Sequence, residues 1–206
     1  MFSKNCSNHL PRIVLAMLLT SLLMTGVNTT YAFEVHFSRV NADGGLRTNF
    51  INCVTQTAEG YIWVGTPNGL HRFDGNRFHQ FHIDGPNRIP PLPVDELLSI
   101  DNGKQLLIRM GNQIGRFDTE KFIFRASSIP VPASQSPKYA YKLKQDHKGN
   151  VFLVIYNMEI LVYNPDKNNF EIDPSVINYP KTIKPTSLQG DKAGNIWIGS
   201  KSGLGV

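Results

Sequence analysis

A short motif recurs four times along this 206-residue chain, and its spacing limits the possible folds more than any other feature. Each copy places a glycine in a polar turn that is followed by a short apolar stretch. The turn glycines are Gly60, Gly103, Gly149 and Gly194, which lie 43, 46 and 45 residues apart. A fixed period of this length indicates repeated units that bury their apolar faces against one another. Helical repeats share the period, so the local sequence must decide between helices and strands.

The residues around the turn glycines favour strands. Asp146 and Asp191 each precede a turn glycine by three residues, as in a tight turn with Asp first and Gly fourth. The residues that follow alternate between β-branched and aromatic side chains, for example Tyr-Ile-Trp-Val at 61–64. No long helical periodicity follows residue 33. The local sequence therefore predicts a β repeat.

A second hairpin closes each unit. Residues 73–78 read FDGNRF, with Asp-Gly between two aromatic-bearing arms, which is a strong hairpin signal. Segments 117–122 and 163–170 repeat this pattern. Four short strands in about 40–45 residues are typical of a β-propeller blade. We therefore predict an all-β propeller of about four blades, each a four-stranded antiparallel sheet, that forms an incomplete ring. The blade repeats are centred near 50–82, 94–125, 139–172 and 186–206.

Residues 1–32 have the three-part pattern of a secretory signal peptide. Lys4 and Arg12 give a positive start, and residues 13–24 are apolar. Residues 30–32 read TYA, which places small residues at a cleavage site before Phe33. Twelve apolar residues are too few to span a membrane comfortably, so a cleaved leader is favoured over an anchor. We predict a periplasmic protein whose residues 33–206 form a partial propeller, with no stable membrane span after cleavage.

The charge distribution limits the possible binding partners, and the cysteine content limits the possible disulfides. Removal of the leader takes Lys and Arg from 21 to 19 against 16 acidic residues, so the net charge falls from +5 to about +3. The charges are scattered without a basic stripe, so nucleic acid is not an expected partner. Cys6 is lost with the leader and Cys53 remains alone. The mature chain therefore forms no intrachain disulfide, and its stability must come from its core.

The recurring residues are predicted to be structural. A large flat side chain on an inner strand fills the space between stacked blades. An aromatic platform for sugar rings is the less supported alternative, because burial is the usual role of such residues. Gly65 and Gly199 are placed where a bend or a close backbone approach is needed. The predicted structural residues are Gly60, Trp63, Gly65, Gly69, Asp74, Gly103, Asp146, Gly149, Phe152, Asp191, Gly194, Trp197, Gly199 and Gly203.

The titratable residues do not form a recognisable catalytic or metal site. His79 and His82 are three residues apart, so on a strand they would point to opposite faces. Asp95 and Glu96 are adjacent, which would also place them on opposite faces of a sheet. We therefore predict no catalytic residue, no metal and no cofactor.

The loops between the second and third strands of the blades are candidates for ligand contact. Asn68, Arg109, Asn112 and Tyr156 lie in these loops, which would cluster at one end of the ring. We predict that these four side chains meet a polar ligand. The alternative is that they are ordinary solvated turn residues.

Two segments resemble the repeat of the two-component regulator propeller family, D-x-x-G-x-I-W-I-G-T-x-x-G-L-x-x-Y/F-D. Residues 60–74 read GYIWVGTPNGLHRFD, with Glu59 displacing the turn acid, and residues 194–204 read GNIWIGSKSGL. The resemblance extends over residues 37–206. It is strong at the first and fourth repeats and weak at the second, where Leu106 replaces the aromatic residue.

The resemblance implies the periplasmic input region of a bacterial receptor, whose output module is a hybrid histidine kinase or a diguanylate cyclase. Ligands of that family are often oligosaccharides. We therefore expect an exported, non-catalytic sensor propeller that binds an oligosaccharide or another small ligand. It would be joined to the remainder of a receptor chain and truncated before the membrane span and the output domain. A periplasmic protein–protein interaction scaffold is the alternative, and an exported polysaccharide-active enzyme is less favoured.

Overall fold

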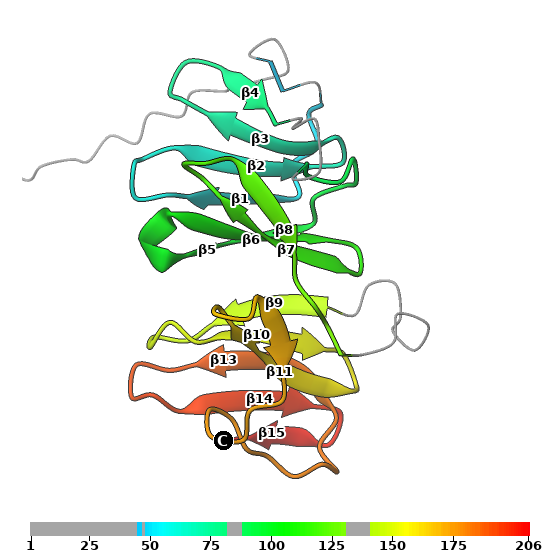
Figure 1. Ribbon diagram of the computed structural model, residues 1–206. Coiled ribbons are helices and arrows are strands. Elements are labelled where there is room, and N and C mark those ends of the chain that lie inside the picture. The colour runs from blue at the N-terminus through cyan, green and yellow to red at the C-terminus, as the bar shows by residue number, and fades with distance from the viewer. Residues whose placement is uncertain (1–44, 47, 82–87, 131–140) are drawn as a thin grey trace, which may run out of the picture. The chain divides into compact units, whose positions relative to one another are not determined.

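The computed structural model describes residues 45–46, 48–81, 88–130 and 141–206. The predicted signal peptide and His82 lie outside these residues. All fifteen strands of the described residues belong to four antiparallel sheets (Figure 1), which confirms the predicted all-β propeller architecture. The sheets are numbered here as blades 1 to 4. No helix within the described ranges is long and apolar enough to cross a membrane.

Each blade is a meander in which neighbouring strands follow one another in sequence. Blade 1 contains β1 (Cys53–Gln56), β2 (Ile62–Thr66), β3 (Gly69–Phe73) and β4 (Phe78–Gln80). Blade 2 contains β5 (Glu96–Ile100), β6 (Gln105–Met110), β7 (Gln113–Asp118) and β8 (Ile123–Ala126), with a 3-10 turn at Asp101–Gly103. Blade 3 contains β9 (Tyr141–Gln145), β10 (Val151–Ile155), β11 (Glu159–Asn164) and β12 (Asn169–Glu171). Blade 4 contains β13 (Pro185–Gly190), β14 (Ile196–Ser200) and β15 (Gly203–Gly205).

The first turn of each blade follows from the repeated motif. In blade 4, the Asp191 carboxylate accepts hydrogen bonds from the backbone and side-chain nitrogens of Asn195, both at 2.9 Å. Gly194 has a φ of +89°, a conformation that favours glycine. In blade 1, Thr57 takes the place of Asp191, because its backbone makes the same two hydrogen bonds across the turn. The sequence suggested that Glu59 displaces the turn acid. The structure shows instead that Thr57 occupies the position of that acid.

The second hairpins close with a repeated side-chain cap. Asp74 Oδ1 accepts hydrogen bonds from the backbone nitrogens of Asn76 and Arg77, both at 2.9 Å. Asp118 and Asn164 make the same type of cap in blades 2 and 3. Such local side-chain caps favour a turn over a continuing strand. The polar residue at the end of the third strand in blades 1 to 3 thus fixes where that strand ends.

The core lies between consecutive blades. One cluster joins blades 1 and 2 around Trp63 and Phe117, a second joins blades 2 and 3 around Leu107 and Leu153, and a third joins blades 3 and 4 around Phe152. Burial of both faces of an inner strand produces a continuous apolar run, as in β10, whose five residues are all buried. Stacking of the blades therefore supplies most of the buried apolar surface.

The glycine in the second strand of blade 1 allows the next blade to approach closely. A Cβ atom on Gly65 would collide with the Cys53 sulfur and would lie 2.6 Å from Val94 Cγ1. Val94 precedes β5 and is completely buried. Gly65 therefore lies where the sequence predicted a close approach.

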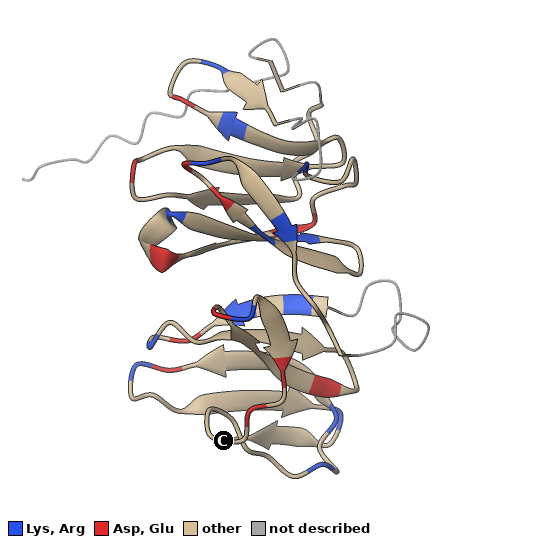
Figure 2. Ribbon diagram, viewed as in Figure 1, with Lys and Arg blue, Asp and Glu red and all other residues tan. Residues whose placement is uncertain are grey.

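Charged residues are distributed over the whole described fold. Figure 2 shows Lys and Arg interspersed with Asp and Glu along all four blades. This matches the scattered charge in the sequence.

Candidate functional site

The repeated blades bring their turns to two opposite ends. We call the turns between second and third strands the tip end; they comprise residues 67–68, 111–112, 156–158 and 201–202. We call the turns between first and second strands the Asp-turn end; they comprise residues 57–61, 101–104, 146–150 and 191–195. In Figure 1 the tip end lies on the right and the Asp-turn end on the left.

Three of the four predicted ligand residues lie at the tip end, on successive blades. Asn68 is exposed in the tip of blade 1, where its carbonyl accepts a hydrogen bond from Gln80 Nε2 at 2.9 Å. Asn112 is half-buried in the tip of blade 2, and Tyr156 is 46% exposed in the tip of blade 3. The fold therefore places these three polar side chains at the same end of consecutive blades.

Arg109 differs from the prediction, because it lies within β6 and not in the loop. Its side chain is only 11% exposed. Its Nε donates a hydrogen bond to Glu96 Oε2 at 2.9 Å, and its Nη1 lies 3.2 Å from both Asp95 Oδ2 and the Gly111 carbonyl oxygen. Its Nε and Nη1 donors are thus engaged within blade 2.

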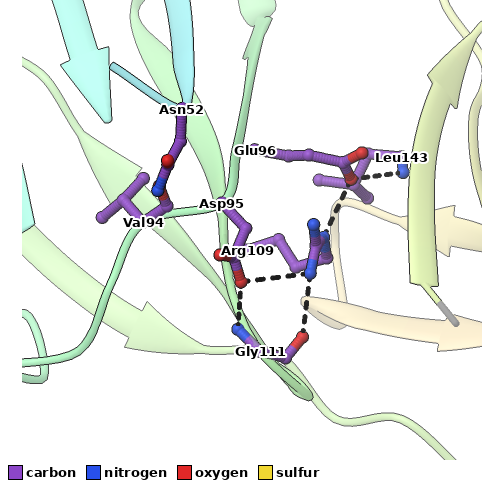
Figure 3. Close-up of polar contacts among 7 residues, drawn as sticks. All are labelled: Asn52, Val94, Asp95, Glu96, Arg109, Gly111 and Leu143. Atoms are coloured by element: carbon purple, nitrogen blue, oxygen red, sulfur yellow. Dashed lines mark hydrogen bonds and ion pairs between the residues drawn. The ribbon is translucent and has the colours of Figure 1, made fainter. Parts of the chain in front are cut away.

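Asp95 and Glu96 were expected on opposite faces, and that expectation is wrong. Both carboxylates reach the Arg109 guanidinium from the start of β5 (Figure 3). The Asp95 carboxylate also accepts a hydrogen bond from the Gly111 nitrogen at 2.7 Å. Asp95 immediately precedes β5, so the strict alternation of a strand does not apply to it.

The same network connects adjacent blades. Glu96 Oε2 accepts a hydrogen bond from the Leu143 nitrogen in β9 at 3.0 Å. Asn52 Nδ2 donates to the Val94 carbonyl oxygen at 2.9 Å (Figure 3). The starts of three consecutive first strands are therefore joined by side-chain hydrogen bonds. The sequence signal for this arrangement is an acidic pair at the start of one strand and an Arg near the end of the next.

Burial is the main reason that the neighbouring Cys53 thiol stays protonated. Burial raises the pKa of Cys53 to about 11, and the negative charges of Glu96 and Asp95 add to the increase. Because the thiolate is the nucleophilic form, the Cys53 side chain is protonated and unreactive at neutral pH.

The histidine and carboxylate groups of the described residues do not assemble into a metal site. His79 Nε2 instead lies 2.7 Å from Asp74 Oδ2. Backbone N–H groups of Arg77 and Asn76 hold the pKa of Asp74 below its ordinary range. Within the described ranges, no three His, Cys, Asp or Glu side chains lie together in a way that would hold a metal ion.

A groove at the Asp-turn end was not anticipated from the sequence. It has a volume of about 930 Å³ and is lined by residues of blades 1, 2 and 3. Its lining is dominated by carboxamide, hydroxyl and charged side chains. The sequence of each turn predicts only hydrogen bonds within that turn. It does not indicate that the turns of three blades line one groove.

Comparison with known proteins identifies the family that the chain resembles. A sequence model described as "Two component regulator propeller" matches residues 45–68. No curated protein matches the chain. The family resemblance found in the repeats is therefore confirmed by an independent match at the first blade.

Two of the solved structures that match the chain are extracellular domains from B. thetaiotaomicron. One, assigned to a one component system, is 20% identical with a TM-score of 0.52, and the match covers 82% of this chain and 22% of that one. Another, assigned to a hybrid two component system, is 17% identical with a TM-score of 0.39, covering 81% and 30%. The first match supports the propeller fold. This chain spans less than a third of the length of either structure.

Proposed function

We propose that this chain is the ligand-binding part of the extracellular sensor region of a bacterial signalling receptor, exported to the periplasm and without catalytic activity. The proposal is supported by the regulator propeller match and by the fold that the chain shares with an extracellular domain of a one component system. Its ligand is an oligosaccharide or another small polar molecule. The remainder of the receptor chain is its structural partner.

The main observation behind the proposal is that side-chain hydrogen bonds hold the backbone of the blade 2 tip in place. Arg109 and Asp95 both bind the backbone of Gly111, the residue before Asn112. A binding residue is effective when the groups around it are held in place before the ligand arrives, because less conformational entropy is then lost on binding. Asn112 is thereby presented from a fixed turn.

The neighbouring tips offer complementary chemistry. The Asn68 amide both donates and accepts hydrogen bonds, and Tyr156 combines an exposed ring with a hydroxyl group. Sugar rings have one apolar face and many hydroxyl groups, which suits this combination. Asp95 and Glu96 are engaged with Arg109, so we assign them a structural role and not general acid or base catalysis.

The proposal is tested by producing the full chain with its own leader in a Gram-negative host and purifying it from the periplasm. Isothermal titration against a panel of oligosaccharides should detect binding without release of shorter products. Tyr156→Ala and Asn112→Ala should each weaken binding at least fivefold, whereas Lys201→Ala on the blade 4 tip serves as the matched control. Retention of the protein in the cytoplasm would contradict export.

Two other results would favour the alternatives. Co-purification of a stoichiometric protein partner, without oligosaccharide binding, would favour a scaffold. Release of shortened sugars would favour an exported enzyme.

A further inference from the structure

We propose that Arg72 and Tyr61 form a docking point for an acidic segment of a separate partner protein, whose carboxylate binds the Arg72 guanidinium. Tyr61 belongs to the first turn of blade 1, at the Asp-turn end, and Arg72 lies beside it, one residue before the end of β3. The residues of the proposed ligand site lie at the opposite, tip end of the blades (Figure 1). The docking point does not require the tip-end site to bind anything.

Arg72 differs from two other partly buried arginines in its lack of an acceptor. Arg109 Nε donates to Glu96 at 2.9 Å, and Arg116 Nη1 donates to the Pro165 carbonyl oxygen at 2.8 Å. The Nε of Arg72 is closed off from solvent and has no acceptor among the described residues, and its Nη groups make no hydrogen bond or ion pair with them. A partly buried guanidinium without an acceptor has lost hydration without compensation, which an incoming acceptor at the Nη groups would supply.

The repeat provides a direct comparison for this arginine. The third strands of blades 1 and 2 both end in the sequence RFD, at 72–74 and 116–118. Asp74 and Asp118 cap their hairpins in the same way, so Arg116 corresponds to Arg72. Arg116 reaches a carbonyl oxygen of the next blade. Within the described ranges Arg72 makes no such bond, so the same repeat position secures one junction and leaves its donors available at the other.

Aromatic rings hold the Arg72 guanidinium in place. Its central carbon lies 4.4 Å from the Tyr61 ring centroid and within 5.8 Å of the centroids of three further rings, those of Trp63, Phe81 and Phe122. The rings attract the positive charge but supply no oxygen acceptor. A side chain that is fixed before binding loses little conformational entropy when a partner arrives. The two Nη groups are thus presented as a fork, which matches the two oxygens of a carboxylate.

The shape of the surface favours a protein segment over a small anion. Neither Arg72 nor Tyr61 lines the groove at the Asp-turn end or either of two smaller cavities of the described residues. Small ligands bind mainly in concave sites. Tyr and Arg are enriched among the residues that dominate the binding energy of protein–protein interfaces. Tyr61 is 37% exposed, so its ring is open to such a partner.

The first test uses two labelled peptides, Gly-Glu-Glu-Gly-Glu-Glu-Gly and its counterpart with Gln in place of Glu, titrated with the full chain and followed by fluorescence anisotropy. At low salt the acidic peptide should bind at least about tenfold more tightly than the Gln peptide, and about 0.2 M NaCl should weaken it. Sodium sulfate, the free-anion control, should compete only weakly. Equal binding of the two peptides overturns the proposal. Sulfate that binds as tightly as the acidic peptide also overturns it, because the site would then be a simple anion site.

Variants assign the binding to Arg72. Arg72→Lys keeps the charge but removes the fork, so it should weaken binding of the acidic peptide at least about fivefold. Arg72→Gln should abolish binding, and Arg72→Lys keeps the test decisive if Arg72→Gln lowers the unfolding midpoint. Arg77→Gln, in the exposed second hairpin of the same blade, is the matched control and should leave the affinity unchanged. Equal weakening by Arg77→Gln would show a general attraction to positive charge and would overturn the proposal.

Two further measurements separate this surface from the other possible occupants and sites. The Nε–H NMR resonance of Arg72 should shift when the acidic peptide is added, whereas a purely structural arginine would give no shift. If sedimentation shows a dimer that Arg72→Gln dissociates, a second copy of this chain occupies the surface and a separate partner is wrong. Tyr156→Ala should leave peptide binding unchanged. Loss of peptide binding in Tyr156→Ala would place the peptide at the tip end, and the docking proposal would fail while the proposed function stands.

Discussion

Blades 1 and 4 carry almost the same sequence motif, yet their tryptophans have different surroundings. Trp63 in β2 is completely buried, with its ring 5.0 Å from Phe81 and 5.5 Å from Phe117 of blade 2. Trp197, the corresponding residue in β14, is 36% exposed. Both follow a five-residue turn at the same register, so the local backbone does not explain the difference.

Hydrogen bonding of the two indole nitrogens follows the opposite order to burial of the two rings. Trp197 Nε1 donates a hydrogen bond to the Asp191 carboxylate, whereas Trp63 Nε1 has no acceptor among the described residues. Blade 1 thus combines full packing of the ring with an unpaired indole nitrogen, and blade 4 combines partial exposure with a hydrogen bond. The motif determines the strand and the turn, and the adjacent blade determines the burial.

The largest expected difference is in how much the free energy of unfolding falls when each ring is removed. Trp63→Ala should lower the free energy of unfolding by about 3–5 kcal/mol, because it opens a cavity in a closely packed junction. Trp197→Ala should cost about 1 kcal/mol, since it removes less buried surface and one hydrogen bond. Urea unfolding of the full chain, followed by circular dichroism, measures both values.

Equal losses for the two variants would contradict the comparison. They would mean that Trp197 is as well covered in solution as Trp63. A small loss for Trp63→Ala would instead show that the junction of blades 1 and 2 relaxes around the cavity.

A second difference concerns two first-turn glycines with almost the same backbone. Gly60 and Gly103 have φ values of +86° and +87°. A Cβ on Gly103 would collide with the Ala58 nitrogen and lie 3.0 Å from Thr57 Cα, whereas nothing lies within 4 Å of a Cβ on Gly60. Gly60→Ala should therefore cost about 1–2 kcal/mol from the backbone conformation alone. Gly103→Ala should cost a further ~1–3 kcal/mol from overpacking.

Thermal unfolding of both variants measures this difference. If Gly103→Ala is no more destabilised than Gly60→Ala, the turn of blade 2 is not packed against the turn of blade 1. The two glycines share their φ, so the matched pair separates packing from backbone strain.

Much of the fold was predictable because its determinants are local. Positive-φ glycines and capping side chains such as Asp74 act within a few residues, so a single sequence shows where strands begin and end. The sequence also shows that Leu106 replaces the aromatic residue in the second repeat. In the structure Leu106 is fully buried at the same junction as Trp63. The exposure of Trp197 was not predictable, because it depends on what packs against a sheet and not on the sheet itself.

The candidate site was predictable only in part, for the same reason. The positions of Asn68, Asn112 and Tyr156 in the tips were predictable because strand periodicity places the tips. Arg109 was misplaced because its burial depends on Asp95 and Glu96, which lie more than ten residues earlier and pair with it across a hairpin. The groove at the Asp-turn end requires three blades together, so no local pattern reveals it.

A third, smaller effect tests how blade 1 is held against blade 2. The Arg72 guanidinium lies 4.4 Å from the Tyr61 ring centroid and within 5.8 Å of those of Trp63, Phe81 and Phe122. A cation over aromatic faces is stabilising, and more so when it is partly removed from water. Arg72→Gln should therefore lower the free energy of unfolding by about 1–2 kcal/mol.

Arg77→Gln is the matched control, because Arg77 is exposed in the second hairpin of the same blade. Its unfolding midpoint in urea should not change measurably. Equal midpoints for the two variants would show that the rings around Arg72 do not contribute to the junction.

The smallest effect concerns the pKa of Asp191. Hydrogen bonds from Trp197 Nε1 and from Asn195 lower the pKa of this carboxyl from 3.8 to about 2, because they favour its charged form. A carboxyl with a depressed folded-state pKa stabilises the fold above its unfolded value, and that contribution is lost as the pH falls from 3.8 toward about 2. Trp197→Phe removes the largest of these hydrogen bonds, so the pKa of Asp191 should rise but stay below 3.8, since the Asn195 donors remain.

An NMR pH titration of the Asp191 carboxyl carbon measures this pKa directly. Trp63→Phe is the control and should leave it unchanged, because that ring lies in another blade. An unaltered pKa in Trp197→Phe would show that the indole does not reach Asp191 in solution. The hydrogen bond that distinguishes the blade 4 tryptophan from its counterpart in blade 1 would then be absent, and the two rings would differ in packing alone.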